Sequence, residues 1–388
     1  MADNAAVAPG THSSGAYSEF VDESQLIANT FLEASLEESR RKPFLNPGIV
    51  VKIRSNALRD QQVKTVLYLA HQLAAEYGLP CFANLCKSSQ IYVSYDVTGQ
   101  RLGTEWRREW EVDTLRTGCL DSALINLPRL AYNADCNQGK FFEFLSEQLE
   151  MVARALEIKY QIMKHYMRGG ALPFSIQNVN GDSYSHLENM TRAVGFVGLN
   201  EAVQCLLNQP IFEDEKALGL AEKIVGYVNQ FTQKNSKKPE TRLVPAMVSN
   251  SDAAHRLAEL DVERYGLGKV QIRGSRENPY YTDLTALPLD VEIPLEKRIF
   301  FEGKFHQLCF GAHLAVLNLP NKETTPEELL TVTSQIVNDS DVGLYAYSRE
   351  LVYCSRCNHV SYGIPSKCSF CESTSTLTYF RRNSSKYA

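Results

Sequence analysis

Several common features are absent from this 388-residue sequence. No apolar run approaches the roughly 20 residues that a membrane-spanning helix needs. The N-terminus also lacks the basic, apolar and small-residue segments of a secretion signal. The net charge of −5 gives no electrostatic reason to expect nucleic-acid binding. These absences favour a cytoplasmic globular protein that binds neither membranes nor nucleic acid.

A dense cysteine framework is also lacking, because ten cysteines are few for a chain of this length. Four of them stand in metal-binding spacing near the C-terminus, and six are scattered through apolar or mixed stretches. We expect a reducing cytoplasm rather than a disulfide-stabilised fold. The six scattered cysteines are Cys81, Cys86, Cys119, Cys136, Cys205 and Cys309.

The strongest local signal is a pair of Cys-x-x-Cys motifs separated by ten residues, which is typical of a zinc ribbon. Gly363 and Pro365 suit the chain reversal between the two motifs. Four thiolates leave no open position for a substrate, so we expect structural Zn²⁺ rather than catalytic or redox-active zinc. His359 lies between the motifs, and we expect it to be a surface residue. The predicted ligands are Cys354, Cys357, Cys368 and Cys371.

Hydrophobic periodicity predicts helices that alternate with short strands. Alternation of this kind predicts parallel βαβ units, and therefore an α/β sheet or barrel covered by helices. Gly78 is expected to end one of the helices. The predicted helices are 23–42, 60–77, 141–167, 214–231, 252–264 and 324–337, and the predicted strands are 48–53, 80–85, 123–127, 243–247, 298–301 and 342–347.

Six short segments follow one another in a distinctive order, with Ile125–Arg129 first. Together they resemble the C-terminal part of the catalytic subunit of anaerobic (class III, glycyl-radical) ribonucleoside-triphosphate reductases. The resemblance covers about residues 22–371 and depends on the set, since each segment alone is weak. The segments are Ile-Asn-Leu-Pro-Arg at 125–129, Phe-Phe-Glu-Phe-Leu at 141–145, Gly-Phe-Val-Gly-Leu-Asn-Glu-Ala at 195–202, Ala-His-Arg-Leu-Ala-Glu-Leu-Asp at 254–261, Asn-Pro-Tyr-Tyr-Thr at 278–282 and Glu-Gly-Lys-Phe-His at 302–306.

The resemblance implies part of a ten-stranded α/β barrel made of two half-barrels, with a finger loop that enters it. Residues 22–348 are expected to form this barrel domain. Residues 1–21 are expected to be a disordered tail, and residues 349–388 the zinc ribbon with a shortened C-terminal tail.

The resemblance also implies an oxidoreductase that makes deoxyribonucleotides for DNA replication. A cysteine thiyl radical on the finger loop would remove hydrogen from the ribose 3′ carbon of a ribonucleoside triphosphate, and the 2′ hydroxyl would leave as water. A glycyl radical, installed by a separate radical S-adenosylmethionine activase, would regenerate the thiyl radical.

For the binding site, the resemblance implies that Asn126 lies beside the ribose. Gly195, Gly198 and the helix that opens at Asn200 would hold the triphosphate, since backbone amides at a helix N-terminus suit phosphate. Tyr280 and Tyr281 would lie near the active end of a strand. Simpler alternatives are that Asn126 caps a loop, that the glycines only mark a turn, and that the tyrosines pack.

Two further residues of these segments also have a simpler interpretation than a functional role. Arg129 can simply pair with a nearby carboxylate, and His306 can be a core histidine with a backbone partner rather than a general base.

Two departures from the family concern the radical residues. No glycine follows Cys371, and residues 378–383 read Thr-Tyr-Phe-Arg-Arg-Asn where the family usually has Arg-Val-x-Gly-Tyr. The stretch 98–106, where the finger-loop cysteine is expected, contains none. Cys119 and Cys86 are the nearest candidates for the thiyl site, and either can instead be an inert thiol.

The family normally begins with an ATP-binding module and the first half of the barrel, which this sequence does not show before residue 22. We therefore expect either a separate chain that supplies the missing half or the glycine, or an unusual closed form of the barrel, and we expect a homo-oligomer. The leading interpretation is a reductase, possibly a fragment of a split enzyme. The alternatives are a catalytically inactive nucleotide-binding or regulatory relative, and an unrelated zinc-ribbon module.

Overall fold

A computed structural model describes residues 11–12, 15–44, 46–55, 57–58, 61–86, 93–102, 116–179, 181–236 and 242–380. Most of the predicted tail at 1–21, part of the stretch 98–106 and residues 381–388 lie outside this description. The chain divides into two compact units, residues 1–92 with 315–384 and residues 93–314 with 385–388. These units cut across the predicted boundary at residue 348, and the domain assignment made from the sequence stays a prediction.

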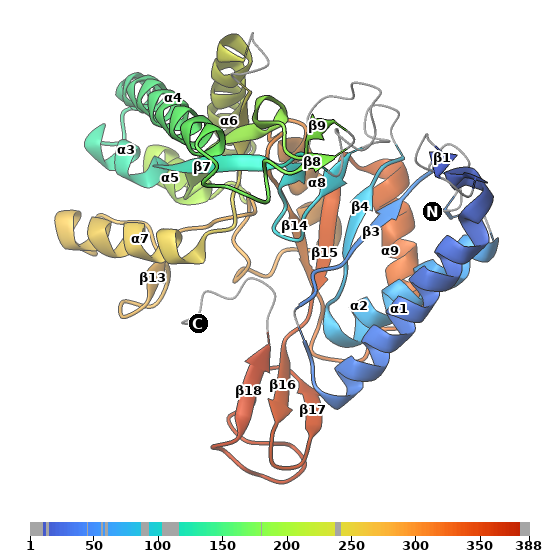
Figure 1. The fold of residues 1–388 in the computed structure, drawn as a ribbon. Helices are drawn as coiled ribbons and strands as arrows, with labels where there is room; N and C mark the ends of the chain where they lie inside the picture. Colours follow the sequence, from blue (N-terminus) through green and yellow to red (C-terminus); the bar gives the residue numbers. More distant parts are fainter. Residues whose placement is uncertain are drawn as a thin grey trace. The chain divides into compact units, whose positions relative to one another are not determined.

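The first unit contains a four-stranded mixed sheet in the order β14-β15-β4-β3. Strands β3 and β4 run parallel, as do β14 and β15, whereas β15 and β4 are antiparallel. Helix α2 lies beside this sheet and packs against both α1 and α9 (Figure 1). Their bounds are Val50–Ile53 (β3), Cys81–Asn84 (β4), Ala315–Asn318 (β14), Leu344–Ser348 (β15), Val21–Arg41 (α1), Gln61–Tyr77 (α2) and Pro326–Asp339 (α9).

Local sequence explains where helix α2 ends and where helix α9 begins. Helix α2 ends before Gly78, whose φ of 71° is the left-handed conformation that glycine adopts without strain. Helix α9 begins with a capping box, in which Thr325 and Glu328 satisfy each other's backbone N–H groups, and Pro326 occupies its first turn. The predicted stop at Gly78 is therefore confirmed.

The second unit contains a parallel three-stranded sheet in the order β11-β10-β7. Strand β10 is buried along its whole length, and helix α4 lies beside β7 (Figure 1). The bounds are Cys119–Asn126 (β7), Thr191–Val197 (β10), Leu243–Ala246 (β11), Leu127–Asn133 (α3), Gln138–Arg168 (α4), Leu199–Leu207 (α5), Glu215–Asn235 (α6), Ser251–Tyr265 (α7) and Leu295–His306 (α8).

The core of this unit is the apolar face of α4 packed on the sheet and on α5 and α6. One side of that helix is buried, and its residues recur at spacings of three and four, at Phe141, Leu145, Leu149, Val152, Leu156 and Tyr160. The long buried face explains why α4 extends over 31 residues.

Ten further short elements of the described chain lie outside these sheets and the zinc ribbon, and Tyr280 is the one predicted site residue among them. They are β1 (Thr11–His12), β2 (Gly15–Ala16), η1 (Tyr17–Phe20), β5 (Ser94–Tyr95), β6 (Arg101–Leu102), β8 (Asn178–Val179), β9 (Asp182–Ser183), η4 (Leu187–Asn189), β12 (Arg273–Gly274) and β13 (Pro279–Tyr280).

All six predicted helices are confirmed, but the strand predicted at 298–301 is wrong. That segment lies inside α8, where Ile299, Phe301 and Phe305 face the core together with Glu302. The short run of Ile and Phe has strand-like composition, and tertiary burial of one helical face overrides it.

The predicted turn at 195–198 is also corrected. Gly195 lies inside strand β10, and only Gly198 turns the chain, with a φ of 73°. A Cβ atom at Gly195 would approach the Leu124 side chain on β7 to 2.5 Å, so close strand packing explains this glycine.

Two of the scattered cysteines are bonded, contrary to the expectation from the sequence. Cys136, just after α3, and Cys205, on α5, form a disulfide with a Cα–Cα distance of 5.8 Å. The two residues are 69 positions apart in the chain, so spacing alone gave no sign of the pairing. Within the described residues, no helix combines the length and apolar character that crossing a membrane requires.

Candidate functional site

The buried carboxylate of Asp261 joins three of the motif segments. Asp261 lies on α7 and is fully buried. Asn126 Nδ2 donates to Asp261 Oδ2 at 2.7 Å, and the Tyr281 hydroxyl donates to the same oxygen at 2.9 Å. Arg129 Nε donates to Asp261 Oδ1 at 2.5 Å. A buried carboxylate needs partners of this kind, and the ion pair with Arg129 confirms the simpler interpretation of that arginine.

Both polar atoms of the Asn126 side chain form hydrogen bonds within the protein. Its Oδ1 atom accepts a hydrogen bond from the Arg129 N–H and so caps α3, while its Nδ2 atom is held by Asp261. The structure therefore contains the capping contact that the sequence offered as an alternative to a ribose contact. Asn126 nevertheless lies at the carboxyl end of β7, where ligands bind in α/β sheets.

Tyr281 is buried and shares a hydrogen bond with Tyr132. Burial, the neighbouring phenol and the Asp261 carboxylate all raise the pKa of the Tyr281 hydroxyl far above its usual value. Tyr280 points elsewhere, with its ring beside His255, and burial raises its pKa as well. Both phenols therefore stay protonated, and Tyr281 acts as a hydrogen-bond donor.

A second buried carboxylate, Glu201 on α5, holds the turn at Gly198 in place. Glu201 accepts hydrogen bonds from Thr282 Oγ1 at 2.7 Å and from the Thr282 N–H at 3.1 Å. The Gly198 N–H in turn donates to the Thr282 carbonyl at 2.8 Å. Burial raises the pKa of Glu201. These hydrogen bonds thus connect the segment 195–202 to the segment 278–282.

Asn200 and Gly198 have clear packing roles. Asn200 is fully buried, its Oδ1 accepts from the Ile211 N–H and its Nδ2 donates to Glu201. A Cβ at Gly198 would lie 2.3 Å from Pro128 Cγ, so only glycine lets α3 and α5 start this close together. The side chain of Asn200 therefore supports the turn, and only backbone groups there are available to a ligand.

A third buried carboxylate, Glu302 on α8, organises the last motif segment. It accepts the backbone N–H groups of Ala286 and Leu287 at 3.1 Å each and contacts His313 Nε2 at 2.8 Å. His313 Nδ1 lies 2.7 Å from His306 Nδ1. Burial lowers the pKa of His306 well below its usual value. His306 is therefore a neutral, hydrogen-bonded histidine, as its simpler interpretation states.

The two candidate thiyl cysteines occupy different places. Cys119 begins β7 and Asn126 ends it, so the two residues lie at opposite ends of one strand. Cys86 follows β4 at its carboxyl end, is partly buried, and has its Sγ 3.7 Å from the Ile53 carbonyl. Burial raises the pKa of both thiols, so both are protonated at neutral pH.

The four C-terminal cysteines form a compact cluster in a three-stranded antiparallel sheet of order β17-β16-β18. Their sulfur atoms all lie within 4.8 Å of one another, with 3.6 Å between Cys354 and Cys371 and between Cys357 and Cys368. Zn–S bonds of about 2.3 Å in a tetrahedron give S–S edges of about 3.8 Å, so the cluster fits Zn²⁺. The strands are Leu351–Cys354 (β16), His359–Tyr362 (β17) and Leu377–Phe380 (β18).

The two cysteine turns have the same backbone geometry. Asn358 donates to the Cys354 carbonyl and Glu372 to the Cys368 carbonyl, and both residues have a positive φ near 57°. His359 is exposed and stacks on Phe370 with ring centroids 5.5 Å apart. Its place outside the cysteine cluster agrees with the prediction for this histidine.

Arg349 fixes this small sheet to the rest of the first unit. Its guanidinium lies 4.3 Å from the ring centroid of Tyr362 on β17. It donates to the carbonyls of Pro320 and Lys322 and to the Thr324 hydroxyl.

Sequence reasoning missed the roles of Asp261, Glu201 and Glu302, although each lies within a recognised segment. The available signal was a carboxylate on the apolar face of a helix, next to small or apolar residues. Such a carboxylate must be paired when the face is buried, and only the fold reveals the partner.

Comparison with solved structures shows that the chain shares its α/β fold with an anaerobic ribonucleotide reductase and, less closely, with a glycerol dehydratase. The anaerobic ribonucleotide reductase from Thermotoga maritima with glycerol in the active site superposes with a TM-score of 0.76 at 16% identity, covering 98% of this chain and 59% of that one. The B12-independent glycerol dehydratase from Clostridium butyricum superposes with a TM-score of 0.56 at 14% identity, covering 83% of this chain and 48% of that one.

Sequence comparison identifies the family. The model of the family "Anaerobic ribonucleoside-triphosphate reductase" matches residues 5–383, and the chain belongs to this family. The reductase of enterobacteria phage T4 is 20% identical over 270 residues, which is 64% of this chain and 42% of that protein. The reductase of Escherichia coli K12 is 21% identical over 214 residues, which is 51% of this chain and 28% of that protein. The chain thus spans less than half the length of these curated relatives.

Proposed function

We propose that this chain holds a ribonucleoside triphosphate in an anaerobic ribonucleotide reductase and presents its ribose for radical chemistry. The observation that carries the proposal is the convergence of the Asn126, Gly198 and Tyr281 segments, which Asp261 and Glu201 fasten together. A site that must hold one substrate geometry benefits from such pre-organisation. The related Thermotoga maritima enzyme, which is described in complex with dATP and CTP, supports a nucleotide ligand.

The proposed binding mode uses backbone groups at Gly198 and the start of α5 for the phosphates, and the carboxyl end of β7 for the ribose. The helix N-terminus supplies N–H donors and a positive dipole end. Asn126 would exchange one of its internal hydrogen bonds for a ribose hydroxyl.

We propose that the thiyl radical forms on Cys86 or Cys119. Seven residue steps of β7 separate Cys119 from Asn126, which is about 23 Å at 3.3 Å per residue, so the extended strand keeps these two residues apart. Cys86 lies two residues beyond the carboxyl end of β4. In the proposed reaction the thiyl radical takes hydrogen from the ribose 3′ carbon and the 2′ hydroxyl leaves as water. Two electrons from formate or a small thiol protein then complete the deoxyribose.

The proposed partners are a radical S-adenosylmethionine activase and a glycine-bearing reductase polypeptide. The activase would install the glycyl radical on that polypeptide. The same proposal assigns the cysteine cluster to structural Zn²⁺ and the protein to cytoplasmic deoxyribonucleotide synthesis for DNA replication.

The second candidate function is a catalytically inactive nucleotide-binding or regulatory relative. One observation favours it: both polar atoms of the Asn126 side chain are engaged in internal hydrogen bonds.

Anaerobic equilibrium dialysis with labelled CTP, followed by turnover assays with the activase and a glycine-bearing reductase polypeptide, distinguishes the two functions. Binding with turnover that one of the two variants Cys86→Ser and Cys119→Ser abolishes is the expected result, and that variant identifies the thiyl position. Binding without turnover under all conditions would support the inactive relative. Absence of binding for CTP, ATP, GTP and UTP would overturn both.

A further inference from the structure

The disulfide between Cys136 and Cys205 joins the ends of two helices whose beginnings carry the proposed nucleotide site. Helix α3 starts directly after Asn126, and its last residue lies three positions before Cys136. Helix α5 starts directly after Gly198 and contains Cys205 in its last turn. The two helices pack against each other. The bond therefore restrains this helix pair at the end opposite to the proposed site.

The Cys205 side chain also packs beside the hydrogen-bonded groups of the site. It lies against a buried cluster that includes Tyr132 and Tyr281. These two phenols share a hydrogen bond, and Tyr281 donates to Asp261. Asp261 in turn accepts from the Asn126 side chain. A displacement of Cys205 would therefore disturb the groups that orient Asn126.

The turn that contains Cys136 has an unfavourable backbone conformation. Asp135 and Cys136 both adopt the left-handed conformation, with φ of 48° and 57°, which a Cβ atom disfavours. The Asp135 N–H donates to the Tyr132 carbonyl at 3.1 Å, and the Cys136 N–H donates to the Ala131 carbonyl at 3.0 Å. The disulfide adds a covalent restraint to these two hydrogen bonds, so opening the bond allows the turn to relax.

The two cysteines differ in exposure. Cys136 is exposed, whereas Cys205 is half-buried on α5. Cys136 also lies directly before Asn137, the N-cap of α4, and a helix N-terminus stabilises a thiolate. We propose that this bond is a reversible thiol–disulfide site, which a protein dithiol opens by attack on Cys136, and that its opening weakens nucleotide binding at the start of α5. The second part rests on the proposed function, whereas the first part does not.

The exchange takes place in two steps. A thiolate of the dithiol forms a bond to Cys136 Sγ, the bond between Cys136 and Cys205 breaks, and the Cys205 thiolate takes a proton from solvent. The second thiolate of the dithiol then attacks the dithiol sulfur bonded to Cys136 and releases Cys136 as a thiolate, which also takes a proton. The protein gains two electrons and two protons, and the dithiol becomes a disulfide. This exchange is separate from the reduction of the ribose.

Opening of the bond changes what nucleotide binding must order. In the oxidised chain the ends of α3 and α5 cannot separate, so the segments at Asn126 and Gly198 keep their arrangement before a ligand binds. In the reduced chain the ligand must itself restrict the motion of the two helices, and this ordering lowers the affinity.

A mixed-disulfide trap tests the site itself. The chain is oxidised with glutathione disulfide and incubated with a thioredoxin whose second active-site cysteine is replaced by serine, and the adduct is mapped by peptide mass spectrometry. An adduct on Cys136 is the expected result, and the Cys136→Ser variant, in which Cys205 is a free thiol, should form none. An adduct on Cys205, no adduct, or two free thiols after the oxidation would overturn the proposal.

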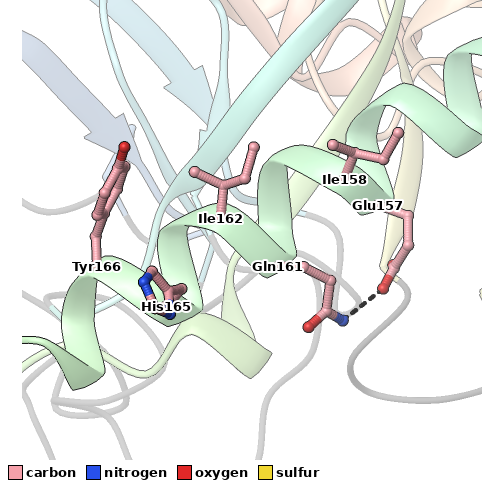
Figure 2. A pocket seen from close by; sticks show the side chains of 6 residues that line it. All are labelled: Glu157, Ile158, Gln161, Ile162, His165 and Tyr166. Atoms are coloured by element: carbon pink, nitrogen blue, oxygen red, sulfur yellow. Dashed lines mark hydrogen bonds between the residues drawn. The ribbon is translucent and has the colours of Figure 1, made fainter.

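Hydrogen exchange measures the consequence of reduction without a nucleotide. Amide exchange in residues 127–133 and 199–207 should be at least about 10-fold faster in the reduced chain. The internal control is the segment from Glu157 to Tyr166, which Figure 2 shows in the second half of α4. This segment starts 21 positions after Cys136, and its exchange should stay unchanged. Equal exchange of α3 and α5 in both forms would overturn the proposal.

Equilibrium dialysis with labelled CTP tests the link to the proposed function. The Kd should be about 10-fold higher for the reduced chain than for the oxidised chain. Cys136→Ser, verified as folded by circular dichroism, should have the Kd of the reduced chain with or without the dithiol. Faster exchange with an equal or lower Kd would overturn the second part of the proposal. Faster exchange without CTP binding in either form would overturn the proposed nucleotide site and support the thiol–disulfide site alone.

Discussion

Asn126 and Asp261 are separated by 135 positions in the chain, and yet Asn126 Nδ2 donates a 2.7 Å hydrogen bond to the Asp261 carboxylate. The contact joins the last residue of β7 to the last third of α7, the helix that follows β11. It also leaves the asparagine fixed in a single orientation at the carboxyl end of β7. The proposed nucleotide site thus depends on a residue that need not touch the nucleotide.

Replacement of Asp261 should lower the free energy of unfolding. The Asp261→Ala variant leaves the Arg129 guanidinium, the Tyr281 hydroxyl and the Asn126 amide without their shared acceptor, and removing one partner of a buried ion pair costs about 3–5 kcal/mol. Urea unfolding should therefore show a loss of that size in the free energy of unfolding. Glu259→Gln, on the exposed side of the same helix, should change it by less than about 0.5 kcal/mol. A similar small effect for both variants would contradict this account of Asp261.

Asp283 should make stability depend on pH. Burial raises its pKa to about 6, although its carboxylate accepts the Asn250 N–H at 2.8 Å. Because the folded-state pKa exceeds the unfolded value near 3.9, the folded chain binds the extra proton between about pH 4 and 6. The contribution of this group is complete below pH 4 and is lost as pH rises through 6, by about 2–3 kcal/mol.

The Asp283→Asn variant isolates that contribution. The amide oxygen can still accept the Asn250 N–H, but the side chain no longer ionises. The free energy of unfolding of the variant, relative to wild type, should increase between pH 4 and pH 7 when both are measured by urea titration. A constant difference over this range would show that Asp283 does not titrate as described.

Zinc content should depend on the four cysteines and not on His359. We expect about one Zn²⁺ per chain by atomic absorption, because four thiolates in tetrahedral spacing complete the coordination of one ion. Cys357→Ser should bind zinc much more weakly under a chelator, and His359→Ala should keep it. Loss of zinc from His359→Ala would place the histidine among the ligands.

Reduction of the disulfide between Cys136 and Cys205 should destabilise the chain. The bond closes a loop of 69 residues, for which loop entropy gives about 4 kcal/mol. The free energy of unfolding should fall by about that amount when a reductant is added. In Cys136→Ser the reductant should have no effect, and an equal effect in that variant would assign the loss to another group.

Local signals predicted much of the fold. Gly78 after an amphipathic run marks the end of α2, and the two Cys-x-x-Cys motifs identify the ribbon, because turn geometry and metal spacing are encoded in neighbouring residues. The segment 298–301 shows where such signals fail, since its composition favours a strand and only the burial of Phe305 and Glu302 makes it a helix.

The candidate site was predictable as a set of segments but not as a set of contacts. Asn126 and Tyr281 were identified through the family resemblance, whereas Asp261 and Glu201 have roles that depend on partners 135 and 81 positions away. The pairing of Cys136 with Cys205 is of the same kind, because the chain alone does not specify which distant thiols meet.

Arg349 connects the ribbon to the segment that precedes α9. Its guanidinium is held by two carbonyls and a hydroxyl of the segment 320–324, and its flat face lies over Tyr362 of the ribbon. These four contacts involve one rigid planar group, so they cannot adjust independently of one another. A movement of Tyr362 would therefore move the guanidinium and its hydrogen-bond partners as well. A shift of the ribbon would therefore also shift the segment 320–324, which leads into α9.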